Sequence, residues 1–101
     1  MSDIVKTFPE EYRTDIEKAV EILKKYGSSE IYIFGSIANG RFDENSDIDI
    51  AVRGLKDEYY FKVLAELGMN IFREIDLIDL DDDNDRFAQF ILKRGAMIKV
   101  A

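Results

Sequence analysis

The segment from residue 46 to 53, SDIDIAVR, alternates strictly between two kinds of side chain. Its apolar positions are Ile48, Ile50 and Val52, and the positions between them are Asp47, Asp49 and Ala51. Because successive side chains of a strand point to opposite faces, this pattern predicts a half-buried β-strand. The chain must therefore build a sheet that has one apolar face to cover and a second face that carries carboxylates.

Hydrophobic spacing and glycine positions divide the rest of the chain into alternating helices and strands. The capping-box spacing of Thr7 and Glu10 around Pro9 predicts the start of the first helix. Asp57 is placed to cap a later helix. The expected elements are a helix that ends at Gly27, a strand at 30–34, a loop at 36–41 with room for no more than a turn or two of helix, the strand at 46–53, a helix from Asp57 to Gly68, a strand at 71–80, a helix between a cap in 81–85 and Gly95, and an edge strand at 97–100.

This order of elements predicts an α/β or α+β fold built on a small mixed sheet of three to four strands. We expect helices to cover one face of the sheet and the other face to be open. The length of 101 residues fits a single domain, residues 1–101, with one hydrophobic core.

The composition excludes several classes of function. The chain has no cysteine and no histidine, so disulfides, zinc sites with nitrogen or sulfur ligands, and catalysis by thiol or imidazole are ruled out. A net charge of −7 disfavours extensive binding to nucleic acid, whose backbone is also negative. No apolar run reaches the roughly 18 residues that span a bilayer, and the first residues do not resemble an export signal. We expect a soluble, cytoplasmic protein that does not associate with membranes.

The spacing of Gly35, Ser36, Asp47 and Asp49 is the main functional signal. At average residue frequencies it arises by chance in on the order of one chain in a thousand. A glycine that ends a strand lets the backbone approach a ligand, and a serine that opens a helical turn can offer its hydroxyl and amide to a phosphate. Two neighbouring carboxylates repel each other unless a cation lies between them, and oxygen ligands favour Mg²⁺. An exposed strand face is the alternative, although Asp is depleted in strands.

A third carboxylate is selected by its register in the third expected strand. Asp76 lies on the face opposite Ile75 and Leu77, whereas Asp79 shares the face of these two apolar residues. If the apolar residues of both strands face the covering helices, Asp76 joins the two aspartates of the earlier strand on the open face. Glu74, which shares the face of Asp76, is the second choice.

These motifs resemble the minimal nucleotidyltransferase (MNT) domains of the DNA polymerase beta superfamily. The resemblance covers most of the chain: its core is FGSIANGRFDENSDIDIAV, supported by REIDLIDL and by the closing FILKRGAMIKV. It implies the nucleotidyltransferase fold and the transfer of a nucleoside monophosphate from an NTP, with ATP expected, to a hydroxyl group. Gly35 and Ser36 would then hold the phosphates of the nucleotide.

The same resemblance implies that Asp47, Asp49 and Asp76 bind catalytic Mg²⁺, with two ions expected, and that Asp76 also deprotonates the attacking hydroxyl. One position departs from the family pattern. Many members read GSxARG where this chain reads GSIANG, so Asn39 replaces an arginine that could contact phosphate. Arg41 is the candidate substitute, and a plain surface role for it is equally open.

In the family, stand-alone MNT domains are commonly encoded with a helical HEPN protein, a ribonuclease toxin, and act as its antitoxin by adenylylating a tyrosine on it. The resemblance therefore implies a HEPN-type partner, and an acidic protein would suit a basic partner that cleaves RNA. The alternative is a non-catalytic binding module that neutralises a partner by complex formation alone. Transfer to a small molecule is disfavoured because the chain is too short to hold an acceptor in a further domain.

Other conspicuous residues have simpler interpretations. The DDDND run at 81–85 resembles a calcium loop, but its sixth and twelfth loop positions are Arg86 and Leu92 rather than Gly and Glu, so a helix cap is expected. Tyr59 and Tyr60 are adjacent on a helix, so one of them must face outward. Four aromatic residues at helical spacing are expected to be core rather than a base-stacking surface: Tyr12, Tyr26, Phe87 and Phe90.

Overall fold

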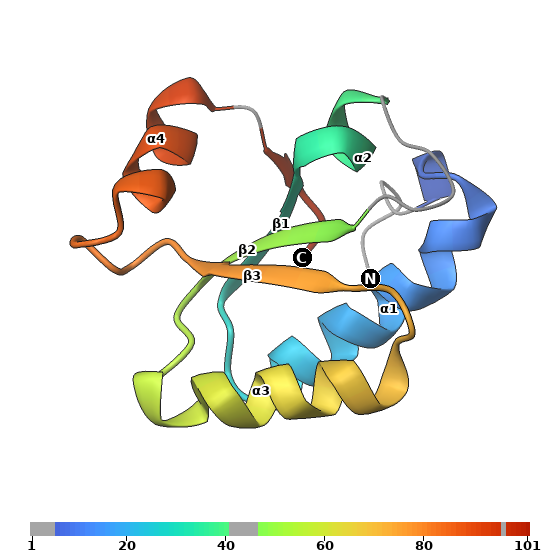
Figure 1. Ribbon diagram of the computed structural model, residues 1–101, viewed down its shortest axis with the longest axis horizontal. Coiled ribbons are helices and arrows are strands. Elements are labelled where there is room, and N and C mark those ends of the chain that lie inside the picture. Colours follow the sequence, from blue (N-terminus) through green and yellow to red (C-terminus); the bar gives the residue numbers. More distant parts are fainter. Residues whose placement is uncertain (1–5, 41–46, 96) are drawn as a thin grey trace.

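A four-stranded mixed sheet in the order β3-β2-β1-β4 forms the centre of the protein (Figure 1). This computed structural model describes residues 6–40, 47–95 and 97–101. β1 pairs antiparallel with β2 and β4, whereas β2 and β3 are parallel and are joined by the crossover helix α3. The described elements are α1 (Glu10–Lys25), β1 (Glu30–Phe34), α2 (Gly35–Asn39), β2 (Ile48–Arg53), α3 (Asp57–Asn70), β3 (Ile75–Asp79), α4 (Arg86–Arg94) and β4 (Ile98–Lys99). The expected fold class is confirmed.

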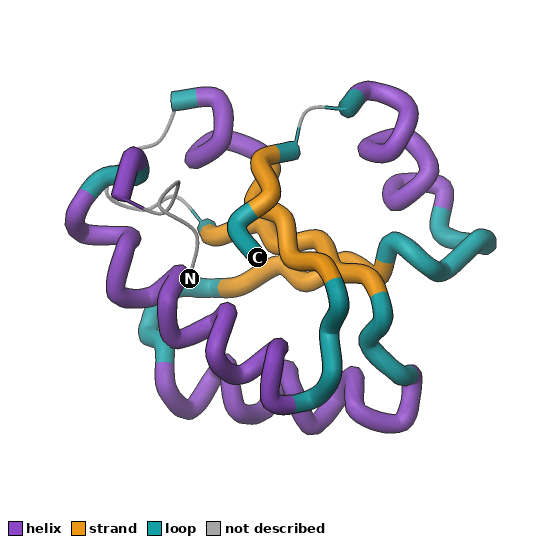
Figure 2. The backbone as a smooth tube through the Cα atoms, turned by 180° about the vertical axis from the view of Figure 1, so that it is seen from behind, coloured by secondary structure: helices purple, strands orange, loops and turns teal. Residues whose placement is uncertain are grey.

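The main core lies between one face of the sheet and the two long helices, α1 and α3, which run side by side beneath it (Figures 1 and 2). Burial of each large apolar side chain stabilises the fold by roughly 1.5–3 kcal/mol, so this layer holds the sheet in place. Helix α1 contributes residues at helical spacing, and the strands contribute the apolar positions of their alternating patterns. The core includes Tyr12, Ile16, Val20 and Leu23 of α1, Ile31 and Ile33 of β1, Ile48, Ile50 and Val52 of β2, Val63 and Leu67 of α3, and Leu77 of β3.

A second, smaller cluster lies on the opposite face of the sheet. Tyr32, Ala51 and Ile78 form one row across β1, β2 and β3, and Ala88 and Ile91 of α4 pack in the same cluster. Helices α1 and α3 cover one face as expected, but α4 covers part of the face that was expected to be open. The row next to it carries the acidic residues of the candidate site.

The ends of α4 and the final strand are confirmed. The Asp85 carboxylate accepts hydrogen bonds from the backbone N–H groups of Phe87 (2.9 Å) and Ala88 (3.2 Å), so the acidic run caps a helix. Gly95 ends the helix in the left-handed conformation, with φ 63°. β4 then lies at the edge of the sheet, beside β1.

The predicted capping box at the start of α1 is wrong. The helix begins at Glu10 with Pro9 as its N-cap residue, and no side-chain hydrogen bond caps this end. The proline ring fixes φ and removes a donor, so the helix starts directly after Pro9 and Thr7 is not its N-cap residue. No helix in the described part of the chain combines the length and the apolar character needed to cross a membrane.

The predicted bounds of α3 are also wrong. Lys56, not Asp57, is the N-cap residue, and the helix passes through Gly68 to Asn70. The Asn70 side-chain amide donates to a backbone carbonyl one turn earlier (2.8 Å), which supports the extra turn. Because the helix is longer than predicted, β3 begins at Ile75 rather than at residue 71.

The aromatic residues of α4 do not belong to the core, so that prediction is wrong for them. Phe87 and Phe90 are each 51% exposed. The buried stripe of α4 is formed one position further along the helix, by Ala88 and Ile91. Tyr12 of α1 is buried, as predicted.

The adjacent tyrosines of α3 are both half-buried. The ring of Tyr59 lies 5.5 Å from the ring of Tyr26, and the Tyr60 hydroxyl donates to the Leu77 carbonyl (2.7 Å). The prediction that one of them faces outward is therefore wrong. The exposed aromatic residue of this helix is Phe61.

Candidate active site

The strand register brings two of the expected acidic residues together. Asp49 of β2 lies directly beside Asp76 of the parallel strand β3, and beside Phe34 of β1 on its other side. Asp47 directly precedes β2, two residues from Asp49, and is half-buried. Glu74 is exposed and lies just before β3, where its carbonyl accepts a backbone hydrogen bond. Asp76 is therefore the carboxylate that register places next to Asp49.

The pKa of Asp49 is raised to about 6. Burial is the largest cause, followed by a hydrogen bond to the Asp76 side chain and by the negative charges of Asp76 and Asp47. A hydrogen bond between two carboxyl groups needs a proton on one of them. Asp49 and Asp76 therefore share an environment in which added positive charge is favourable.

Gly35 directly follows β1 and lies against one member of this pair, Asp49. Its φ of +74° is left-handed, and a Cβ atom at this position would collide with the Asp49 carboxylate. Both requirements are met only by glycine. The backbone at the start of α2 therefore lies directly against the Asp49 side chain.

The remaining residues of the GSIANG motif form α2. Ser36 follows Gly35 in the first turn and is half-buried, while Ile37 anchors the short helix in the main core. Asn39 is the last residue of α2 and is exposed. Arg41, the candidate phosphate contact, lies outside the described residues. The structure thus brings Gly35 and Ser36 to the end of the sheet that carries Asp49 and Asp76.

Asp79 belongs to a different environment. It pairs with Val52 in register and lines a cavity with Asp57, Tyr60 and Leu77 beside α3. Burial raises its pKa, while a hydrogen bond from the backbone of Asp81 opposes the shift. Asp79 therefore does not join the acidic pair.

The donor set suits Mg²⁺, which prefers a few carboxylate oxygens and leaves positions open for water and phosphate. Asp49 and Asp76 offer such oxygens side by side, and a cation there would offset the negative charges that help to raise the pKa of Asp49. Within residues 6–40, 47–95 and 97–101, however, no group of three or more His, Cys, Asp or Glu side chains is close enough to hold a metal ion. The acidic pair is formed in this structure, and Asp47 acts on it through its charge.

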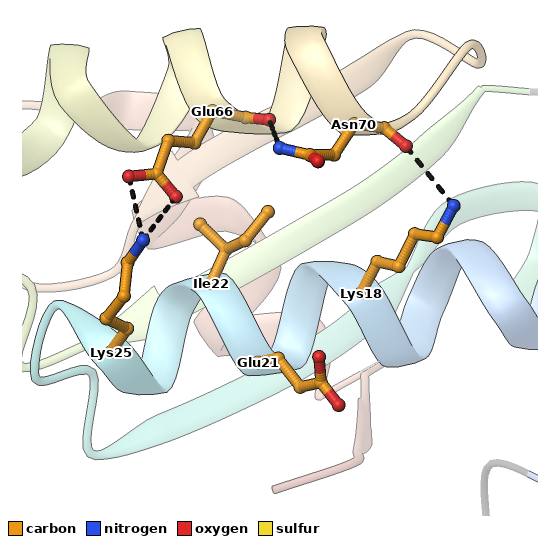
Figure 3. Close-up of a pocket in the computed structure, with 6 residues that line it drawn as sticks. All are labelled: Lys18, Glu21, Ile22, Lys25, Glu66 and Asn70. Carbon is orange, nitrogen blue, oxygen red and sulfur yellow. Dashed lines mark hydrogen bonds and ion pairs between the residues drawn. The ribbon is translucent and has the colours of Figure 1, made fainter.

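A separate pocket of about 320 Å³ lies between α1 and α3 (Figure 3). The Lys25 ammonium group donates to both carboxylate oxygens of Glu66, at 2.9 and 2.6 Å, and the Lys18 ammonium group donates to the Asn70 carbonyl at 3.4 Å. These contacts bridge the two helices on the far side of the sheet from Asp49. The residues that line this pocket therefore connect the two helices and do not belong to the candidate site.

Two features of the site were not foreseen from the sequence. The contact between Gly35 and Asp49 depends on the pairing of two separate strands, so no short stretch of sequence predicts it. The exposed pair Phe87 and Phe90 could have been found from the helical period, because positions 88 and 91 form an alternative apolar stripe of α4.

Comparison with known proteins gives the family. Residues 17–100 match the family described as polymerase beta, nucleotidyltransferase. No match was found among curated proteins. The mixed sheet, the acidic pair and the glycine at the start of α2 define a nucleotidyltransferase domain. The match extends over most of the sequence, and the chain belongs to the polymerase beta nucleotidyltransferase family.

Solved structures agree with this assignment. A toxin-antitoxin structure with AMP-PNP has a TM-score of 0.66 and 26% identity, over 82% of this chain and 69% of that chain. The complex of a tri-AMPylated Shewanella oneidensis HEPN toxin with an MNT antitoxin has a TM-score of 0.53 and 25% identity, over 71% of this chain and 58% of that chain. A structure described as a minimal nucleotidyltransferase has a TM-score of 0.67 and 19% identity, over 91% of this chain and 93% of that chain, and shows the fold alone.

Proposed function

We propose that this protein is a Mg²⁺-dependent nucleotidyltransferase that moves AMP from ATP to a hydroxyl group, a tyrosine hydroxyl, of a partner protein. The observation that carries the proposal is the contact of three segments at one end of the sheet. The Asp49 side chain is hydrogen-bonded to Asp76 and lies against the backbone of Gly35. The carboxylates could bind cations, and the backbone at Gly35, whose conformation requires glycine, could approach the triphosphate of a nucleotide closely.

In the proposed reaction, the acceptor oxygen bonds to the α-phosphorus of ATP while the bond from that phosphorus to the bridging oxygen breaks and pyrophosphate leaves. Asp76 accepts the proton of the acceptor hydroxyl. Gly35 and Ser36 hold the phosphates, with Arg41 as a further contact. Two Mg²⁺ ions held by the three aspartates (Asp47, Asp49 and Asp76) would supply positive charge to the attacking and leaving oxygens.

The proposed partner is a helical HEPN-type toxin, which this protein would inhibit as its antitoxin. The structural neighbours support this choice, since one contains AMP-PNP and another contains a HEPN toxin that carries AMP groups. The net charge of −7 would also favour association with a basic partner.

The test is to incubate the protein with ATP, Mg²⁺ and a partner protein that co-purifies with it or is encoded by an adjacent gene, and to weigh the partner by intact mass spectrometry. We expect the partner to gain the mass of one or more AMP groups. The gain should disappear in Asp47→Asn and Asp49→Asn. Asp83→Asn is the matched control, because Asp83 is an exposed aspartate outside the site. A wild-type protein that leaves the partner's mass unchanged would contradict the proposal.

A second candidate is a non-catalytic binding module that neutralises its partner by complex formation. Two observations favour it: Asn39 replaces the arginine of the common motif, and no three-carboxylate group is assembled among the described residues. The same experiment separates the candidates. Neutralisation that persists in the double variant Asp47→Asn/Asp49→Asn, without a change in partner mass, would identify the binding module.

A further inference from the structure

Helix α4 presents two aromatic rings to solvent. Phe87 and Phe90 are each 51% exposed. Their rings are nearly parallel, with an interplanar angle of 17° and a centroid distance of 6.4 Å. The two residues therefore form one continuous aromatic surface, which we call the α4 aromatic surface.

This surface adjoins the candidate active site. The rings of Phe87 and Phe34 are in edge-type contact, with a centroid distance of 6.1 Å and an interplanar angle of 63°. Phe34 is the strand neighbour of Asp49 and directly precedes Gly35. Side chains paired across neighbouring strands lie about 5 Å apart. The distance from the Asp49 side chain through Phe34 to Phe87 is thus short enough for one nucleotide to span.

The two features also share a face of the sheet. The residues of α4 pack on the row formed by Tyr32 and Ala51, which is the row next to Phe34 and Asp49. In Figure 1, α2 and α4 both lie above the sheet, while α3 lies below it. A ligand whose phosphates rest near α2 could therefore reach α4 without crossing the sheet.

Positive charge borders the α4 aromatic surface. The Arg94 guanidinium carbon lies 5.4 Å from the centroid of the Phe90 ring, and Lys93 shares the same last turn of α4. A cation over an aromatic ring is favourable. Aromatic rings beside basic groups suit the flat base of an anionic nucleotide.

We propose that Phe87 and Phe90 hold the base of the nucleotide by stacking, while its phosphates lie at Gly35. This inference rests on the proposed function and deepens it by assigning a base subsite. Stacking uses the π-face that every base has, so it distinguishes bases weakly. ATP and GTP are therefore expected to bind with similar affinity at this subsite.

The test measures the dissociation constants of ATP and of inorganic tripolyphosphate, both with Mg²⁺, by isothermal titration calorimetry. Phe87→Leu and Phe90→Leu keep apolar side chains but remove the rings. We expect each to weaken ATP binding by about 5- to 30-fold and to leave tripolyphosphate binding within about twofold of wild type. Phe90→Tyr, which keeps a ring, should restore ATP binding. Phe72→Leu is the control, because Phe72 is an exposed phenylalanine between α3 and β3.

The outcomes separate this inference from the proposed function. Unchanged ATP binding in both leucine variants, or an equal loss of ATP and tripolyphosphate, would overturn the base subsite. Loss of partner binding with unchanged ATP binding would assign the surface to the partner protein instead and would equally overturn it. If wild type binds ATP but transfers nothing to the partner, the proposed function fails while the base subsite can still be measured. If wild type binds neither ligand, both fail.

Discussion

Two glycines at the ends of α2 have nearly the same backbone conformation but different surroundings. Gly35 has φ +74° and Gly40 has φ +73°. A side chain at Gly40 would meet nothing within 4 Å, whereas one at Gly35 would strike the Asp49 carboxylate. The left-handed conformation therefore explains why glycine occupies both positions, but only at Gly35 does the contact with Asp49 also exclude a side chain.

Alanine at the two positions separates these effects. Gly35→Ala and Gly40→Ala should each lower the free energy of unfolding by about 1–2 kcal/mol, because both place a Cβ in left-handed backbone. Only Gly35→Ala must also displace the Asp49 carboxylate, so it should weaken Mg²⁺-ATP binding by about tenfold or more. Urea unfolding and calorimetry measure the two quantities. Equal ATP affinities in the two variants would show that the contact with Asp49 has no role in binding.

Asp49 makes the metal-free protein sensitive to pH. Its pKa of about 6 in the folded protein is above its ordinary value of 3.8, so the folded state binds more protons between these values than the unfolded state does. The contribution of Asp49 to stability therefore falls as pH rises from about 4 to about 7.

Asn removes this titration and can still donate a hydrogen bond to Asp76. In EDTA, Asp49→Asn should raise the free energy of unfolding by about 1 kcal/mol near pH 8, allowing for solvent screening, and by less near pH 5. Urea unfolding at the two pH values measures the difference. Asp83→Asn should show no such dependence on pH, and a gain for Asp49→Asn that is equal at both values would refute the assignment.

Among the elements, α4 carries the proposed base subsite, and the contacts that stabilise this helix also position the subsite. Its start is fixed by the Asp85 cap and its end by Gly95, and its buried stripe of Ala88 and Ile91 packs on the sheet. The Asp85 carboxylate binds the backbone of Phe87 itself. The cap therefore helps to place the ring that contacts Phe34.

Removal of this cap tests the connection. Asp85→Ala leaves two backbone N–H groups without their acceptor and should lower the free energy of unfolding by about 1 kcal/mol. Because the first turn of α4 then loosens, ATP binding should weaken by a few-fold while tripolyphosphate binding stays the same. Asp83→Ala provides the control from the same acidic run. If Asp85→Ala is as stable as wild type in thermal unfolding, the cap does not anchor the helix.

At the scale of the whole molecule, one face of the sheet stabilises the fold and the other carries the candidate site. The face under α1 and α3 holds the main core, and the opposite face carries the acidic pair and α4. The contact between Lys25 of α1 and Glu66 of α3 in Figure 3 reinforces the first layer, and the Glu66 carboxylate also accepts a hydrogen bond from the Tyr26 hydroxyl. Changes in this layer should alter stability without altering the site.

Glu66→Gln tests this separation. The hydrogen bond from Lys25, and then the one from Tyr26, lower the pKa of Glu66, so its stabilising effect is present above the ordinary carboxyl pKa and is lost as pH falls. The variant should therefore melt at a lower temperature than wild type at neutral pH and at nearly the same temperature in acid. ATP binding should not change. Glu21→Gln, in the same pocket, is the control, and a loss of ATP affinity in Glu66→Gln would show that the faces are coupled.

The alternation at 46–53 specified β2 and the faces of its side chains, because a strand has a period of two. The same rule placed Asp76 on the face of Asp49, and Gly95 located the end of α4. These features depend on local geometry, which the order of residues dictates. The order of residues therefore predicted the fold class and the composition of the acidic pair.

Three-dimensional packing was needed for the rest. The stripe that α4 buries was chosen by its fit on the sheet, which left Phe87 and Phe90 exposed, and the approach of Gly35 to Asp49 arose from the pairing of β1 with β2. Burial raised the pKa of Asp49 in a way that no sequence pattern encodes. Such properties depend on which distant residues become neighbours, and that is set by the free energy of the folded chain as a whole rather than by any one segment.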